Sequence, residues 1–245
     1  MKVLSIGNSF SIDAHAYLYA LAKQRNIDLE LVDLAIGGCS LQKHWENVVN
    51  NRLDYLHVVN GEDFKEKGAS IEEILKSDSF DVITLQQVSH LSGQYETYQP
   101  YLNDLIAYVH KHQPNAKLYL HRTWAYEIDS THSEFYRYDC NQQKMYEAIK
   151  EASLVACKET GLIPIPAGNV IQALRQNIPK FDYANGGESL CIDGFHMSHT
   201  YGRYAVALTW LATLTGKTVA PMDFKGLDSQ IIASICEIVN KIVFE

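Results

Sequence analysis

The stretch KVLSIGNSFSIDAH, residues 2–15, contains the end of one predicted element and the start of another. Residues 3–6 form a short apolar run, which is typical of a buried strand, and Gly-Asn-Ser at 7–9 is typical of a turn. Apolar residues then recur with helical spacing between 14 and 22. A serine at a strand-to-helix turn, here Ser9, serves as a helix cap, a turn residue or a nucleophile.

The same alternation of strand and helix continues along the chain. Strands are predicted at residues 3–6, 29–35, 81–86, 117–121 and 162–165. Helices are predicted at 14–24, 41–59, 71–75, 101–110, 142–158 and 170–176, and after residue 193 the pattern is helical only. This order predicts an α/β fold, a three-layer α/β/α sandwich around a mainly parallel five-stranded sheet. No linker-like segment divides the chain, so we expect one domain over residues 1–245.

The composition excludes several classes of partner. The net charge is -8, and no basic stripe is present. Nucleic acids and anionic membranes are recognised by clustered Lys and Arg, so neither is expected as a partner. No apolar run approaches about 18 residues, which predicts no membrane span. The sequence gives no indication of the oligomeric state.

The cysteines and the N-terminus bear on the compartment. The five cysteines are scattered and form no CxxC pair, which predicts buried thiols in a reducing compartment rather than disulfides or a zinc ribbon. No stretch of signal-peptide type precedes the first strand. A cytoplasmic location is expected, with a removed leader left open. No cofactor or metal is expected.

Ligand sites of open α/β sheets form on the loops that follow the carboxyl ends of strands. The predicted loops are GNSFS, IGGCSL, LQQVSHLSG and HRTWAYEIDSTHSEFYRYD, and a fifth segment, CIDGFHMSHTYGR, lies near the C-terminus. We expect all five to lie along one edge of the sheet.

The fifth segment carries the partners that a nucleophilic serine needs. Such a serine requires a base within hydrogen-bonding distance and a third group that orients the base. Asp193 and His196 are three residues apart, a spacing that lets the carboxylate accept from Nδ1–H and leaves Nε2 free for a hydroxyl. Ser9, His196 and Asp193 are therefore predicted to form a catalytic triad. This arrangement differs from the G-x-S-x-G elbow of the α/β-hydrolases.

These blocks resemble those of the SGNH hydrolases, the GDSL esterase/lipase superfamily. IGNSFS resembles the first block, with Ser9 as nucleophile, and DGFH resembles the fifth, with Asp193 and His196. IGGCSL resembles the second block, which implies that the backbone N–H of Gly38 belongs to the oxyanion hole together with that of Ser9. The sequence is similar in particular to an uncharacterised bacterial subgroup that carries GNSFS, LQQ-x-S and DG-x-H.

One block departs from the superfamily pattern. The usual third block is Gly-x-Asn-Asp, whose asparagine completes the oxyanion hole, whereas this chain has LQQVS at residues 85–89. Carbohydrate acetylesterases of the superfamily have Gln-Gly-Glu-Ser there, which QQVS resembles at both ends. Gln86 is predicted to take the role of the asparagine, with Gln87 as the second candidate. The alternative for either glutamine is that its side chain only bonds to backbone groups of the loop. The alternative for Gly38 is that it only permits a tight turn with a positive φ.

The loop after the fourth predicted strand bears on the substrate. It is about 17 residues long, which exceeds the usual βα connection, and long loops of this kind are commonly functional. Trp124 and Tyr126 belong to a group of aromatic residues in it and are predicted to stack on a sugar, with packing of the loop as the alternative. His44, shortly after the second block, is a candidate for a supporting role beside the site.

The resemblance implies a serine esterase that hydrolyses small acyl esters through an acyl-enzyme. The third block and the aromatic loop favour acetyl esters of carbohydrate. The alternatives are a lipid or thioester hydrolase, and a non-catalytic carbohydrate-binding domain, against which the intact set of Ser9, Asp193 and His196 argues.

Overall fold

The computed structural model describes residues 1–61 and 63–245. In this part of the chain, seven strands form one sheet in the order β4-β3-β2-β1-β5-β6-β7. The strands are β1 (Lys2–Gly7), β2 (Glu30–Ala35), β3 (Tyr55–Val59), β4 (Asp63–Ala69), β5 (Val82–Leu85), β6 (Lys117–His121) and β7 (Ile163–Ile165). Strands β2, β1, β5, β6 and β7 are parallel, as predicted, whereas β3 and β4 are antiparallel.

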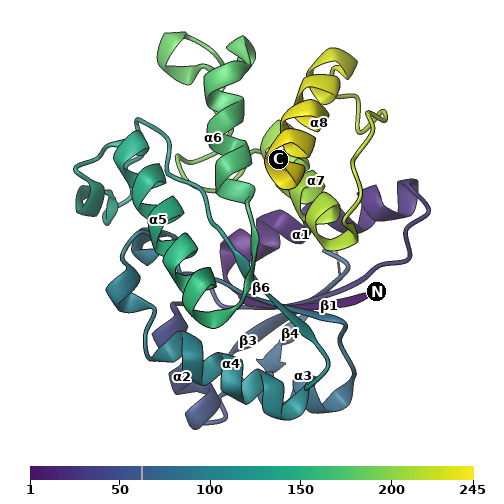
Figure 1. Cartoon of the computed structure of the whole chain (residues 1–245), viewed down its shortest axis with the longest axis vertical. Helices are drawn as coiled ribbons and strands as arrows, with labels where there is room; N and C mark the ends of the chain where they lie inside the picture. The colour runs from purple at the N-terminus through teal and green to yellow at the C-terminus, as the bar shows by residue number, and fades with distance from the viewer. Residues whose placement is uncertain (62) are drawn as a thin grey trace.

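Eight α-helices in the described residues cover the sheet on both faces (Figure 1). They are α1 (Ser9–Gln24), α2 (Leu41–Val49), α3 (Ile71–Ser77), α4 (Tyr101–His112), α5 (Gln142–Thr160), α6 (Ala167–Asn177), α7 (Tyr201–Thr215) and α8 (Ser229–Phe244). Helices α2, α3 and α4 lie on one side, and α1, α6, α7 and α8 lie on the other. None of the helices in this part of the chain has the length and apolar character needed to cross a bilayer.

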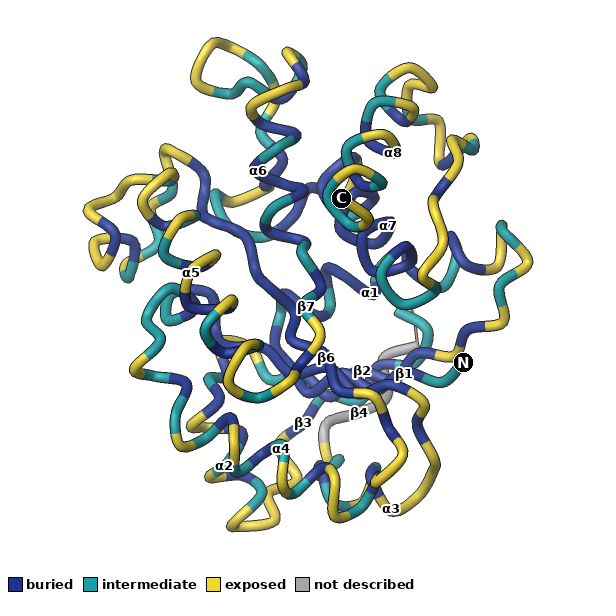
Figure 2. The backbone as a smooth tube through the Cα atoms, viewed as in Figure 1, coloured by how far each residue is buried: buried dark blue, intermediate teal, exposed yellow. Residues whose placement is uncertain are grey.

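The central strands are buried (Figure 2) and separate two hydrophobic cores. Successive side chains of a strand point to opposite faces. Val3 and Leu31 therefore join the core under α1 and α7, whereas Leu4 and Val32 join the core above α2 and α4. Burial on both faces explains why these strands read as continuous apolar runs in the sequence.

The antiparallel edge was not predicted from the sequence. Strands β3 and β4 add to the five predicted strands, and β3 occupies the end of the helix predicted over 41–59. Helix α2 ends at Val49, and Asn51, two residues later, has a positive φ of 44°. Strand β3 ends immediately before Asn60 and Gly61, whose φ values are 54° and 73°. An Asn-Gly pair favours these left-handed conformations and is a strong hairpin signal, so this pair was the indication in the sequence of the two further strands.

A buried carboxyl group lies beneath the start of α1. Asp33 of β2 is fully buried, and its Oδ1 is 2.8 Å from Oγ of Ser11, which in turn is 2.7 Å from the carbonyl oxygen of Asn8. The single Ser11 hydroxyl proton serves only one of these acceptors. Burial raises the pKa of Asp33 to about 8, although the bond with Ser11 lowers it. A protonated Asp33 therefore donates to Ser11, which donates to Asn8.

We predict that Asp33→Asn is more stable than the native chain at pH 8. Folding raises the pKa of this carboxyl from 3.8 to about 8, so the native chain should lose stability as the pH rises through this range. An asparagine amide still donates to Ser11 and carries no such dependence. Urea unfolding of both proteins at pH 5 and pH 8 measures the difference. A native chain whose free energy of unfolding changes with pH as that of the variant does would refute the protonated state.

Candidate active site

Three side chains from the two ends of the sequence form a chain of hydrogen bonds. Ser9 is the first residue of α1, two positions after the last residue of β1, and its Oγ lies 2.9 Å from Nε2 of His196. Nδ1 of the same imidazole lies 2.6 Å from Oδ2 of Asp193. With the proton of neutral His196 on Nδ1, Nε2 is free to accept from the serine hydroxyl. This geometry meets the requirement of a nucleophilic serine for a base within hydrogen-bonding distance and a third group that orients the base.

A local turn holds Asp193 and His196 together. Oδ1 of Asp193 accepts the backbone N–H groups of Phe195 and His196, at 3.1 and 2.8 Å, and this leaves Oδ2 for the imidazole. Gly194 has a φ of 87°, a conformation that glycine adopts without strain. Partial burial raises the pKa of Asp193, but the hydrogen bonds from His196 and Phe195 outweigh it and hold the pKa below its usual value. The carboxylate is therefore ionised at neutral pH.

Helix α1 anchors the segment that carries His196. Asp13 lies one helical turn after Ser9, and its Oδ2 accepts the backbone N–H of Met197 at 2.8 Å. Its other oxygen pairs with Arg203 of α7, at 2.9 Å to Nε. Because Asp13 is nearly fully buried, this pair fixes the segment around His196 relative to the helix that begins at Ser9.

The structure contradicts the prediction that Trp124 and Tyr126 form a sugar platform, because both side chains are fully buried. Trp124 stacks on Phe10, with ring centroids 4.1 Å apart, and its Nε1–H donates to the carbonyl of Phe195 at 2.7 Å. The hydroxyl of Tyr126 lies 2.8 Å from Oγ of Ser89. Packing of the loop, the alternative interpretation, is what the structure contains.

Ser9 and Gly38 line one cavity, and the backbone N–H groups of both are without a protein acceptor in the described residues. The N–H of Ser9 belongs to the first turn of α1, where helices leave donors unpaired. Gly38 follows β2 in a turn closed by Cys39 N–H and the Ile36 carbonyl, and its φ is 66°. A Cβ at Gly38 would meet no atom within 4 Å, so the left-handed backbone rather than space favours glycine here.

Gln86 is held behind the site rather than in it. Its amide nitrogen donates to Oδ1 of Asn8 at 2.7 Å, and its Oε1 accepts from Nδ1 of His121 at 2.9 Å. Asn8 caps α1 by accepting from the N–H of Phe10, and its own amide donates to the carbonyl of Cys39 at 3.1 Å. Through Asn8, Gln86 is therefore connected to the loop that carries Ser9 and to the loop that carries Gly38. Gln86 itself does not line the cavity beside Ser9.

Gln87 also bonds within the fold. Its Oε1 accepts the backbone N–H groups of Leu41 and Val88, at 3.0 and 2.8 Å, and its amide nitrogen donates to Thr97. The side chain is buried and does not line the cavity. The alternative interpretation, that a glutamine satisfies loop backbone groups, describes the contacts of Gln87. Gln86 instead bonds to the side chains of Asn8 and His121.

The cavity beside Ser9 has a volume of about 290 Å³. Its walls come from the loops after β1, β2, β5 and β6 and from the segment around His196, which are the five segments expected to meet at one edge. His90, His132 and Phe195 also line the cavity, although none of them was predicted as a site residue from the sequence. The length of the loop after β6 was the available signal for His132.

A family model described as a domain of unknown function, DUF4886, matches residues 2–237. The chain belongs to the DUF4886 family. A crystal structure of a DUF4886 protein from Bacteroides uniformis is 34% identical, with a TM-score of 0.90 and coverage of 100% of this chain and 95% of that one. Among functionally curated proteins, none matches the sequence.

More distant structures identify the fold of this family member. A proposed SGNH hydrolase from Slackia heliotrinireducens is 19% identical, with a TM-score of 0.58 and coverage of 87% of this chain and 98% of that one. An acetylxylan esterase from Geobacillus stearothermophilus is 12% identical, with a TM-score of 0.55 and coverage of 86% and 92%. The chain therefore has an SGNH-like fold, as the sequence blocks predicted.

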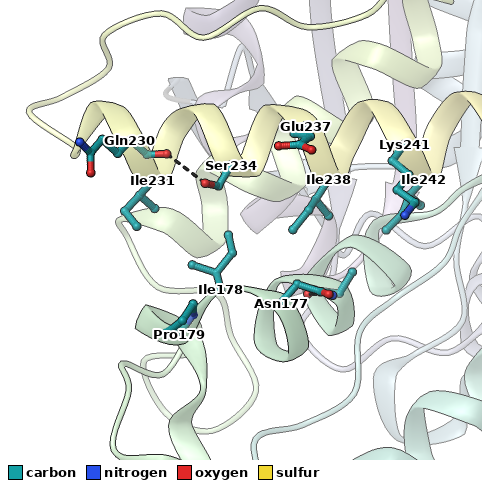
Figure 3. Close-up of a pocket in the computed structure, with 11 residues that line it drawn as sticks. Asn177, Ile178, Pro179, Gln230, Ile231, Ser234, Glu237, Ile238, Lys241 and Ile242 are labelled. Atoms are coloured by element: carbon teal, nitrogen blue, oxygen red, sulfur yellow. Dashed lines mark hydrogen bonds between the residues drawn. The ribbon is translucent and has the colours of Figure 1, made fainter.

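Two other features of this DUF4886 chain lie outside the cavity. His44 is fully buried, with Nδ1 2.8 Å from the hydroxyl of Tyr55 and 3.5 Å from Sγ of Cys39, so it packs beneath the loop that carries Gly38. A groove of about 570 Å³ runs between α6 and α8 (Figure 3). It shares no lining residue with the cavity beside Ser9.

We predict that Gln86→Leu lowers the activity of the site while the fold persists. The substitution removes the amide that holds Asn8, and displacements of about 1 Å in a catalytic site cost about a hundredfold in rate. The measurement is kcat/KM for p-nitrophenyl acetate, with thermal unfolding recorded beside it. The matched control is Thr84→Val on the adjoining strand, which breaks a buried bond to Ser5 away from the cavity. Equal activities of the two variants would contradict the positioning role of Gln86.

Proposed function

We propose that this chain is a serine esterase in which Ser9 is the nucleophile, His196 the general base and Asp193 the group that orients it. The observation that carries the proposal is the continuous set of hydrogen bonds from Asp193 through His196 to Ser9, at 2.6 and 2.9 Å. An accessible hydroxyl, an imidazole and an ionised carboxylate in this order are the parts that acyl transfer by serine requires.

The proposed reaction has two halves. As Ser9 Oγ attacks the ester carbonyl carbon, its proton passes to Nε2 of His196. The tetrahedral intermediate then collapses, and the imidazolium gives that proton to the departing alcohol oxygen, leaving an acyl-Ser9. In the second half, His196 deprotonates a water molecule that attacks the acyl carbonyl, and the proton returns to Ser9 Oγ as the carboxylic acid leaves. This chemistry requires no cofactor or metal.

The developing negative charge has two proposed donors, the backbone N–H groups of Ser9 and Gly38. Donors held in place before the reaction stabilise an oxyanion without reorganisation. The positive end of the α1 dipole, at Ser9, adds to this stabilisation. Gln86 and Gln87 have no direct part in this proposal, because their observed hydrogen bonds are made to groups of the fold.

A short acyl group, acetyl in particular, suits the site best. The cavity volume of about 290 Å³ lies at the lower end of the range for small-molecule pockets, so it favours a small ester over a long acyl chain. The similarity in fold to an acetylxylan esterase supports a carbohydrate hydroxyl as the alcohol.

We expect Ser9→Ala to abolish nearly all esterase activity, since triad serines contribute on the order of a millionfold to turnover. Its hydroxyl bonds only to His196 among the described residues, so stability should change little. A fluorophosphonate should add one mass increment to the native chain and none to the variant, with the exposed Ser79→Ala as control. Undiminished hydrolysis by Ser9→Ala would exclude the triad.

A panel of p-nitrophenyl acetate, butyrate and octanoate, run beside an acetylated xylan, tests the acyl preference. We expect kcat/KM for the acetate to exceed that for the octanoate by at least about tenfold, because even one methylene changes the rate by about tenfold or more in a hydrophobic pocket. Acetate release from the xylan would support the carbohydrate assignment. Preference for octanoate would instead favour a lipid or thioester hydrolase.

A further inference from the structure

A histidine outside the triad lines the same cavity as Ser9. His132 lies in the long loop after β6, and His90 follows β5; their rings lie side by side with centroids 5.9 Å apart. In the described part of the chain, these two belong to no group of three or more side chains suited to a metal ion. The question is what a histidine in this position does.

The hydrogen bonds of His132 determine which nitrogen carries its proton. Nδ1 accepts the backbone N–H of Glu134 at 3.1 Å, so it presents a lone pair and the proton of the neutral ring lies on Nε2. Among the described residues Nε2 has no protein partner, and it is not a buried atom. His132 therefore offers an N–H donor that no protein group uses.

The ring is held firmly beside His196. The rings of His132 and Phe195 are nearly perpendicular, with an interplanar angle of 87° and centroids 4.9 Å apart. The ring of Tyr126 also contacts that of His132, with centroids 4.7 Å apart. Phe195 itself is fixed, because its N–H bonds to Asp193 and its carbonyl accepts from Trp124. Partial burial lowers the pKa of His132, and His196 lowers it further, while Glu134 and Asp193 oppose them. The donor is thus neutral and oriented at neutral pH.

The position of His196 indicates which part of an ester lies near His132. In acyl transfer the imidazole that protonates the leaving oxygen lies on the alcohol side of the scissile bond, and the oxyanion donors lie on another side. The segment of Phe195 and His196 therefore borders the alcohol, whereas Gly38 borders the oxyanion. His132 packs on this same segment.

We propose that His132 is a specificity residue that donates a hydrogen bond from Nε2–H to an oxygen of the alcohol next to the ester, such as the neighbouring hydroxyl of an acetylated sugar. The proposal rests on the proposed esterase function. A neutral donor of this kind selects a hydroxyl or ether oxygen rather than requiring an anionic substrate.

The test uses two esters that differ by one hydroxyl, trans-2-hydroxycyclohexyl acetate and cyclohexyl acetate. The native chain should prefer the hydroxylated ester by about fivefold to tenfold in kcat/KM, the value of one net hydrogen bond. His132→Phe keeps an aromatic ring against Phe195 and should abolish the preference. His132→Gln places an amide donor near the position of Nε2 and should restore part of it. His110→Phe, an exposed histidine on α4, is the control that keeps the native preference.

Several results would overturn this role. A native chain that hydrolyses both esters equally would contradict it and leave the esterase proposal intact. Equal losses on both esters in His132→Phe would assign the residue to packing alone. If His132→Phe fails to fold, the ratio of kcat/KM for the two esters in the native chain and in His132→Gln decides the matter. No hydrolysis of either ester or of p-nitrophenyl acetate would instead refute the proposed function, and this assignment with it.

Discussion

The hydrogen bond between Ser9 and His196 joins residues that are 187 positions apart, and the rest of the site depends on it. No local interaction brings the two together. The contact forms because α1 and α7 pack side by side over the same core, so that the start of one helix meets the segment that leads into the other. Asp13 reinforces the contact, since one buried carboxylate on α1 binds both Met197 and Arg203.

A second constraint lies beneath the two loops that carry Ser9 and Gly38. The amide nitrogen of Asn8 donates to the carbonyl of Cys39 in the loop after β2, and its Oδ1 accepts from the amide nitrogen of Gln86 in the loop after β5. Three loop regions therefore meet at one side chain. Buried amides are costly when unpaired, and this set is satisfied only when the loops hold their observed separation. The loops that carry the backbone N–H groups of Ser9 and Gly38 are therefore held together by polar contacts made within the protein.

Much of this architecture was predictable because its signals are local. The central parallel strands appear as apolar runs because both of their faces are buried. The turn at Gly7 to Ser9 follows from residue types that favour turns and helix caps. The hairpin of β3 and β4 was missed, although Asn60 and Gly61 signalled it, because the apolar residues before them also fit helical spacing. The long loop after β6 was predicted to lie over Ser9, and its His132 lines the cavity with Ser9. Its aromatic rings were assigned wrongly, because aromatic residue type does not distinguish a ring that packs from one that is exposed.

The sequence by itself determined the order of the five parallel strands, the SGNH-like blocks and the presence of a serine, a histidine and an aspartate of the types and spacing that acyl transfer needs. Only the tertiary structure decided that Gln86 and Gln87 face inward to the fold, that Trp124 and Tyr126 are buried, and that Nε2 of His132 has no partner among the residues that the structure describes. The physical reason is that a side chain's direction and its hydrogen-bond partners depend on segments that are distant in the sequence. A residue's type specifies which bonds it can make, whereas packing of the helices on the sheet specifies which of those bonds remain free for a substrate.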